Sequence, residues 1–251
     1  MKIAIYSIWD GEELLKYSID SIRSGIDKII SVTQLKSNHG VFYSGGHDKA
    51  VELLKMGLID EIIEYEPNLK YNPMRNEKIK RSKGLGVAKQ LGGDYYMMMD
   101  CDEMWLKVPK PNQAHQMKTF FKYPTLQYET YENYHVAGLI ELNSSSKIGG
   151  SCGFWVDPTR TPNRKLTLGS EIMHHYSYVR TDINRKIENS SAKSNIFAKN
   201  KQLKTDYEKA CNGYELGFTD NKLVSVPNYF NIEIPICKSV QGVNEATANR
   251  K

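Results

Sequence analysis

A chain of 251 residues is long enough for one large α/β domain, or for a domain with a subdomain, and its composition is that of an ordinary globular protein. No apolar run approaches the roughly 20 residues that a membrane-spanning helix needs, so we expect no membrane partner. The formal net charge of +5 is mildly basic, which allows a polyanionic partner without requiring one.

The start of the chain and its cysteines both favour a cytoplasmic location. Met1–Ile8 is a short apolar run with one basic residue, but a turn at Asp10-Gly11 follows at once, which predicts a first strand and not a signal peptide. The four cysteines show no Cys-x-x-Cys spacing and are typical of free thiols in a reducing compartment.

Strands and helices alternate through the first hundred residues. Continuous apolar runs predict strands at Lys2–Ile8, Lys28–Val32, Ile59–Tyr65 and Tyr95–Met99. Helical spacing of apolar residues predicts helices at Glu12–Arg23, Ser44–Leu58 and Met74–Leu91, the last one interrupted by Gly84 and Gly86. This alternation favours an α/β fold with a mostly parallel, doubly wound sheet.

The pattern changes after Glu103. In chain order we expect a short helix at Asn112–Phe121, antiparallel strands within Thr125–Leu142, a strand at Gly150–Val156, a polar loop at Asp157–Gly169, an apolar segment at Ile172–Val179, a helix within Thr181–Ala198 and a return to the sheet at Val224–Ile236.

The stretch Asp94–Trp105 is the main candidate site. Its strand Tyr95–Met99 is uniformly apolar or aromatic, which is typical of a strand buried on both faces of a parallel sheet. Asp100, Asp102 and Glu103 follow at its C-terminal end, where open α/β sheets bind ligands. In extended backbone Asp100 and Asp102 share one side, and two carboxylates can hold Mg²⁺ or Mn²⁺ that also binds a diphosphate. The alternative is an acidic turn that caps a helix.

Two further segments are candidates for the same site. Trp9 and Glu12 follow the first strand, where a nucleotide base and ribose sit in this kind of sheet, although Trp9 could instead only cover the core. An imidazole from His174 or His175 can complete a site that holds two carboxylates. Adjacent strand residues face opposite ways, so at most one binds. We expect His175, with a buried core histidine as the alternative.

The glycine-rich segment Gly149–Asp157 contains Trp155. Glycines let backbone approach a ligand closely, and an exposed aromatic ring can stack on a sugar or a base. The alternative is a hairpin with Trp155 in the core. Asp157 and Glu171 are the acids nearest in sequence, and either could serve as a general base.

Basic residues form two groups. The first is Lys70, Arg75, Lys78, Lys80, Arg81, Lys83 and Lys89, and the second is Arg160, Arg164, Lys165, Arg180, Arg185, Lys186 and Lys193. Such runs are usually solvated, but one or two members could neutralise a phosphate.

These segments resemble the nucleotide-sugar domain of GT-A-fold glycosyltransferases, close to the broad family-2 group. The resemblance rests on Lys2–Trp9 with Glu12–Ile22, on Arg75–Gly92, on Asp94–Glu103 and more loosely on Met173–Lys186. It implies a GT-A type of α/β fold, a mostly parallel doubly wound sheet with an antiparallel extension on the acceptor side. We therefore divide the chain into a nucleotide-sugar-binding half at 1–108, an acceptor-side half at 109–238 and a polar tail at 239–251.

The resemblance also implies roles for particular residues. In that family a strand ending in Asp-x-Asp holds the metal and the sugar diphosphate. It implies metal ligation, of Mn²⁺ or Mg²⁺, by Asp100, Asp102 and His175, and contacts to a UDP-type nucleotide-sugar donor by Ile8, Trp9, Glu12, Lys83, Asp100 and Lys186. No pattern marks the catalytic base, so Asp157 and Glu171 both stay open.

A small basic chain of this type is similar to phage-encoded glycosyltransferases that modify 5-hydroxymethylcytosine in DNA, the arabinosyltransferases among them. That similarity implies transfer of arabinose or glucose to hydroxymethylated DNA in the host cytoplasm. A base modified within a duplex generally has to leave the stack, and Trp155 could hold it.

Three alternatives remain. The acceptor could be a surface polysaccharide or a lipid-linked glycan. A nucleotidyltransferase could use the same acids, but it would be expected to carry a basic glycine-rich signature where Trp9–Glu13 is acidic. A non-enzymatic nucleic-acid-binding module would use the basic groups, but it leaves the stretch Asp94–Trp105 unexplained.

Overall fold

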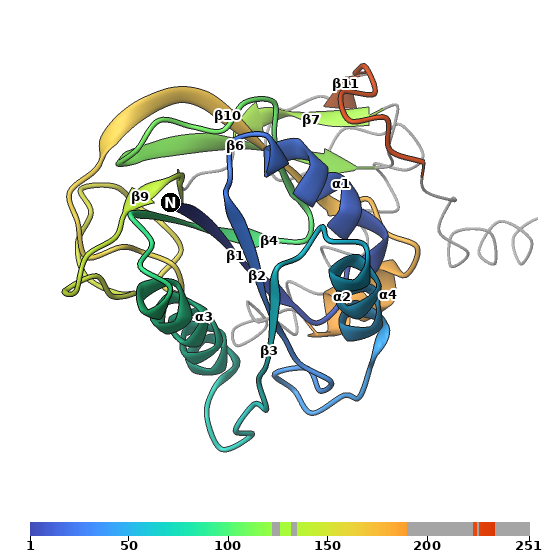
Figure 1. Ribbon diagram of the computed structural model, residues 1–251. Helices are drawn as coiled ribbons and strands as arrows, with labels where there is room; N and C mark the ends of the chain where they lie inside the picture. The colour runs from blue at the N-terminus through green and yellow to red at the C-terminus, as the bar shows by residue number, and fades with distance from the viewer. Residues whose placement is uncertain (122–125, 132–134, 190–222, 225, 234–251) are drawn as a thin grey trace, which may run out of the picture.

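The computed structural model describes residues 1–121, 126–131, 135–189, 223–224 and 226–233. Its centre is a five-stranded sheet with the order β3-β2-β1-β4-β9 (Figure 1). The strands are β1 (Lys2–Ile8), β2 (Lys28–Thr33), β3 (Glu61–Glu64), β4 (Tyr95–Asp100) and β9 (Ile140–Glu141). The first four are parallel, and β9 runs antiparallel to β4. The predicted α/β fold with a mostly parallel sheet is confirmed.

Helices cover both faces of this sheet. They are α1 (Glu12–Arg23), α2 (Gly45–Lys55) and α3 (Pro73–Gln90). In Figure 1, α1 and α2 lie on one side of the sheet and α3 lies on the other. The central strand β1 serves both layers, because its side chains alternate. Tyr6 and Ile8 belong to the core that includes Leu15 of α1, and Ile3 and Ile5 belong to the core on the α3 side.

A second, curled sheet has the order β11-β7-β6-β10-β5, with β8 paired to β6. Its strands are β5 (Glu103–Trp105), β6 (Gln113–Phe121), β7 (Leu126–Tyr131), β8 (Val136–Ala137), β10 (Thr167–Tyr178) and β11 (Leu223–Val224). β6 and β10 are parallel to each other and the remaining pairs are antiparallel. The antiparallel strands expected within Thr125–Leu142 are therefore present. Trp105, Met117 and Met173 join this sheet to the core around α1.

The helix predicted at Asn112–Phe121 is wrong, because these residues form β6. Ala114, Met117 and Phe120 recur every three residues, which imitates a helical face. All three are buried because β6 lies inside the second sheet between β7 and β10. Pairing with distant strands therefore outweighs the local pattern.

Glycines explain two other differences from the prediction. The strand expected at Gly150–Val156 is an irregular segment, since Gly149, Gly150 and Gly153 have positive φ values of 97°, 144° and 84°. The interruption expected in the third helix is absent, and α3 is continuous. A side chain at Gly84 would overlap Ile5 and Val32 of the sheet, so this glycine allows the helix to pack closely.

The C-terminal part is described only in portions. The helix expected within Thr181–Ala198 is α4 (Ile183–Asn189), and its continuation lies outside the described residues, as do the end of Val224–Ile236 and the tail 239–251. β11 joins β7 of the second sheet. β10 begins at Thr167, inside the stretch expected to be a loop. Within the portions described, no helix is long and apolar enough to cross a bilayer.

Candidate functional site

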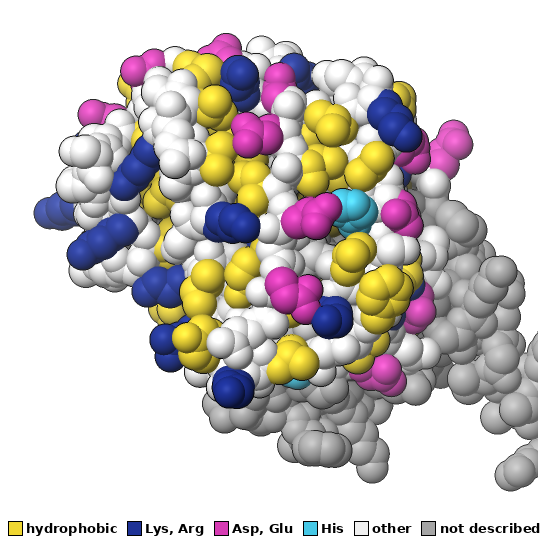
Figure 2. Space-filling view, turned by 60° about the horizontal axis from the view of Figure 1, so that its bottom comes forward, with side chains coloured by type: hydrophobic (Ala, Val, Ile, Leu, Met, Phe, Trp, Pro, Cys, Tyr) yellow, Lys and Arg dark blue, Asp and Glu magenta, His cyan; other side chains and the backbone are white. Residues whose placement is uncertain are grey.

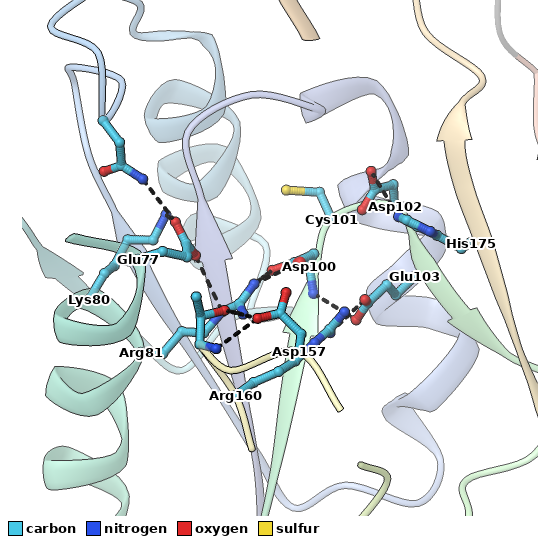
Figure 3. A network of polar contacts seen from close by, with 12 residues as sticks. Glu77, Lys80, Arg81, Asp100, Cys101, Asp102, Glu103, Asp157, Arg160 and His175 are labelled. Carbon is cyan, nitrogen blue, oxygen red and sulfur yellow. Dashed lines mark hydrogen bonds and ion pairs between the residues drawn. The ribbon is translucent and has the colours of Figure 1, made fainter. Parts of the chain in front are cut away.

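The carboxyl ends of β1 and β4 lie side by side, because Ser7 pairs in register with Asp100. Beyond Asp100 the chain turns through Cys101 and Asp102 and enters β5 of the second sheet. The turn separates the two aspartates. In Figure 3, Asp100 points toward α3 and Asp102 toward β10, so the prediction that they share one side was wrong.

Asp100 is held by Arg81 of α3. Arg81 Nη2 lies 2.8 Å from both carboxylate oxygens, and Arg81 Nε lies 3.2 Å from Glu77 Oε1 on the same helix. Arg81 also donates to the Thr159 hydroxyl. Burial would raise the pKa of Asp100, but Arg81 and Arg160 outweigh it and lower that pKa. Asp100 is therefore an ionised carboxylate with a fixed cationic partner.

Asp102 is almost completely buried and faces three cationic or basic groups. It accepts a hydrogen bond from Arg180, its Oδ2 lies 3.0 Å from Lys186 Nζ, and His175 Nε2 lies 3.8 Å from the same oxygen. Burial would raise the pKa of Asp102, but Lys186, Arg180 and His175 together hold it well below its usual range. The Lys186 side chain is 26% exposed, so a ligand can reach it from solvent.

The two histidines have different surroundings. His175 pairs in register with Glu103 of β5 and faces Asp102. His174 stacks on Phe120, with ring centroids 5.0 Å apart, and meets Tyr229 and Phe230 edge-on. Burial, with a smaller effect of Lys118, lowers the pKa of His174 to about 4. The alternation of a strand therefore places one imidazole at the site and the other in an aromatic cluster.

Glu103 completes the polar network. It is fully buried, its Oε1 lies 2.6 Å from Arg160 Nη1, and its Oε2 accepts from the Asp100 backbone N–H at 3.1 Å (Figure 3). Burial raises the pKa of Glu103, and Arg160 reduces this effect. Arg81, Arg160 and Arg180 belong to the site, although the sequence pattern did not single them out. One signal could have indicated them, because acids that follow a buried strand need cationic partners at the same edge of the sheet.

The residues predicted to contact the nucleotide are largely enclosed. Ile8 is fully buried in the core, so its side chain faces no ligand. Trp9 is mostly buried and meets Tyr43 edge-on at 5.8 Å, which favours the alternative that it covers the core. Glu12 accepts from Tyr43 and from Arg185 Nη2, the latter at 3.0 Å. Of these three side chains Glu12 alone is charged, and Tyr43 and Arg185 already contact it.

Lys83, which the resemblance assigned to phosphate binding, donates to the Glu64 carbonyl at 2.7 Å, at the end of β3. Of the two candidate bases, Asp157 lies near Arg81 and Arg160, and its Oδ1 accepts from the Thr159 hydroxyl at 2.7 Å. Burial would raise the pKa of Asp157, but the two arginines and Thr159 lower it. Glu171 lies beside His115, about 13 Å along β10 from His175. The structure therefore brings Asp157 to the site and not Glu171.

The acids fit a metal ion only in part. Both oxygens of Asp100 contact Arg81, whereas Asp102, in the turn after β4, and His175 of β10 converge. Across residues 1–121 and the other described ranges, no group of three His, Cys, Asp or Glu stands close enough to hold a metal. Mg²⁺ often takes one or two protein ligands and completes its shell with water and phosphate oxygens. Asp102 and His175 fit that mode, with Mn²⁺ as the ion that more readily accepts a nitrogen ligand.

Many cations of the two basic groups are turned inward. Arg81, Arg160, Arg180 and Lys186 pair with the site acids, and Arg164 pairs with Glu141 at 2.5 Å. Figure 2 shows the molecule turned so that the bottom of Figure 1, with the loops after β2 and β3, comes forward. Lys and Arg gather there toward the α3 side, and acidic and basic side chains are mixed elsewhere.

The fold and the site together define an α/β protein with a mostly parallel sheet in the order β3-β2-β1-β4 and a second, curled sheet. Its charged network lies where the first sheet passes into the second. No protein-family model and no curated protein sequence matches the chain.

Proposed function

We propose that this chain is a glycosyltransferase that moves a sugar from a nucleotide-diphosphate sugar, of the UDP type, to an acceptor hydroxyl. The observation that carries the proposal is the convergence of His175, Arg180 and Lys186 on Asp102, beside the end of β1. The strand order, with β9 antiparallel at the edge, supports the GT-A type of fold to which the sequence is similar.

Lys186 would bind the diphosphate. Negative charge grows on the leaving diphosphate as the bond to the sugar breaks, and a positioned cation stabilises that charge. Lys186 can donate from its partly exposed position while Arg180, which is buried, keeps Asp102 ionised. Breaking the Arg180–Asp102 pair is not required.

Asp102 and His175 would be the protein ligands of Mn²⁺ or Mg²⁺. When bound, the ion supplies Lewis-acid stabilisation of the leaving group. Asp100 would act through Arg81, which it holds against Thr159 and so beside Asp157. Asp157 would receive the hydrogen bond of the acceptor hydroxyl, since its lowered pKa keeps it ionised.

The test is release of free UDP. The protein is incubated with UDP-glucose or UDP-arabinose, with Mn²⁺ or with chelator, and UDP is quantified with and without acceptors. We expect Mn²⁺-dependent release that Lys186→Ala and His175→Ala both weaken. A nucleotidyltransferase would instead release pyrophosphate from a nucleoside triphosphate, and a nucleic-acid-binding module would release neither product.

The DNA acceptor stays a prediction. It was drawn from two basic groups, several members of which are now seen in internal ion pairs. The Lys and Arg side chains that gather toward the α3 side in Figure 2 are what remains to support it. Mass spectrometry of nucleosides after incubation with hydroxymethylated duplex tests it directly.

A further inference from the structure

Trp155 is held in solvent by a fixed backbone. Its side chain is 70% exposed, whereas Trp9 and Trp105 are 8% and 1% exposed, so the alternative that placed Trp155 in the core is excluded. Its carbonyl accepts from His135 N–H at 2.8 Å, and the next carbonyl, that of Val156, accepts from the Thr161 hydroxyl at 3.1 Å. Tryptophan is usually well buried, so an exposed one on a pinned backbone favours a binding role.

Asp157 lies on the same side of the backbone as Trp155. Val156 between them is buried in the core, and its bridge to His135 keeps this short segment extended. Alternate residues of an extended segment leave the backbone on the same side, so Trp155 and Asp157 start from one side with α-carbons about 6.6 Å apart. The carboxylate of Asp157 then turns toward Thr159 and Arg81. Through Thr159, Asp157 is connected to Arg81 and Asp100.

An indole face beside a carboxylate suits a carbohydrate. The apolar C–H face of a pyranose ring packs on an aromatic ring, while its hydroxyls donate to carboxylate oxygens. We infer that Trp155 and Asp157 form the acceptor subsite and that the acceptor is a neutral saccharide. The inference rests on the proposed function and adds to it the chemical class of the acceptor.

The charges around this pair favour a saccharide over a nucleic acid. The arginines near Asp157 are paired with acids of this chain, Arg81 with Asp100 and Arg160 with Glu103. A phosphate near Trp155 would also meet the negative charge of Asp157. A neutral ring meets no such repulsion, and its hydroxyls satisfy the carboxylate.

The test uses tryptophan fluorescence of the full chain. Because only Trp155 of the three tryptophans is well exposed, acrylamide quenching reports mainly on it. The probes are maltotriose, cellotriose and chitotriose, with a hydroxymethylated DNA duplex as the other class. We expect at least one trisaccharide to protect Trp155 from acrylamide. Its affinity should not change between 50 and 500 mM salt, because binding of a neutral ligand releases ~0 counterions.

Three variants sharpen the result. Trisaccharide binding is measured by calorimetry. Trp155→Ala is expected to weaken it on the order of tenfold or more, and Trp155→Phe is expected to weaken it less because a ring face remains. Met56→Ala is the matched control, since Met56 is 55% exposed at the C-terminal end of α2, away from the strand ends that form the site. Equal binding by Trp155→Ala and Met56→Ala overturns the subsite.

The outcomes separate this inference from the proposed function. Protection of Trp155 by the duplex and by no trisaccharide, or by none of the probes, overturns the saccharide inference whatever the enzyme assay shows. Absence of UDP release from every donor overturns the glycosyltransferase proposal. A trisaccharide that protects Trp155 still establishes the binding site in that case, because quenching requires no turnover.

Discussion

Arg81 and Asp100 form a two-oxygen contact in which one guanidinium nitrogen lies 2.8 Å from each carboxylate oxygen. Arg81 is buried, so its charge depends on Asp100 and Glu77 for compensation. The two aspartates of the Asp-x-Asp motif therefore have different surroundings. Asp100 is tied to a structural cation, and Asp102 faces His175 and the accessible Lys186.

Asp100→Asn is expected to lower the free energy of unfolding by about 1–3 kcal/mol, because it leaves the charge of Arg81 with less compensation. Chemical denaturation of the wild type, Asp100→Asn, Arg81→Met and the double variant gives the coupling between the two residues. Asp20→Asn, which removes an exposed pair with Lys16, is the control and should cost less than about 0.5 kcal/mol. Equal effects of Asp100→Asn and Asp20→Asn would contradict the structural role.

Asp102→Ala is expected to lower turnover on the order of a hundredfold, because the leaving group loses stabilisation. Part of the loss in any assay will come from unfolding, since buried Arg180 also loses its partner. Circular dichroism of the same sample gives the folded fraction, by which turnover is corrected. Corrected turnover equal to that of the wild type would remove Asp102 from the catalytic site.

His175→Ala is expected to raise the Mn²⁺ concentration for half-maximal activity, and His174→Ala is expected to leave it unchanged. The reason is that His175 faces Asp102 and His174 lies among Phe120, Tyr229 and Phe230. Metal titrations of both variants measure the difference. The same shift in both, or in neither, would show that His175 binds no metal.

His174 predicts a loss of stability in mild acid. Its pKa is lowered from 6.5 to about 4 in the folded chain, so between these pH values the unfolded state binds more protons. Its contribution is complete above pH 6.5 and falls as pH decreases toward 4, by on the order of 3 kcal/mol in total. His174→Phe keeps the ring stacking and should flatten this part of the profile of unfolding free energy against pH. An unchanged slope in that variant would contradict the assignment.

Two glycines of α3 provide a matched pair. Gly84→Ala is expected to destabilise the fold by about 1–3 kcal/mol, because the new methyl group would overlap Ile5 and come within 2.9 Å of Val32. Gly86→Ala meets open space and should stabilise the helix by about 0.5–1 kcal/mol. Thermal unfolding of both variants checks the opposite signs. Stabilisation by both would mean that α3 lies farther from the sheet.

The first hundred residues could be predicted because each element there carries its own signal. β4 is uniformly apolar, and α1 has buried residues at helical spacing. β6 could not be predicted in the same way, since its strand conformation depends on pairing with β10, more than fifty residues later. The site residues also divide into those that the sequence indicates and those that only the tertiary structure shows. Asp102 and His175 were singled out by position, but the pairing of Arg81 with Asp100 and of Arg160 with Glu103 needed the tertiary structure.

The passage of the chain from β4 directly into β5 has a consequence for biosynthesis. Asp102 and Glu103 follow β4, but their cationic partners Arg160, Arg180 and Lys186 are made later. A nascent chain that has just completed β5 therefore carries two acids whose partners are still to be synthesised, and burial of those acids is unfavourable until then. The two sheets can therefore pack on each other only after β10 and α4 have been synthesised. A chain that ends before Arg180 is expected to expose this junction to proteolysis.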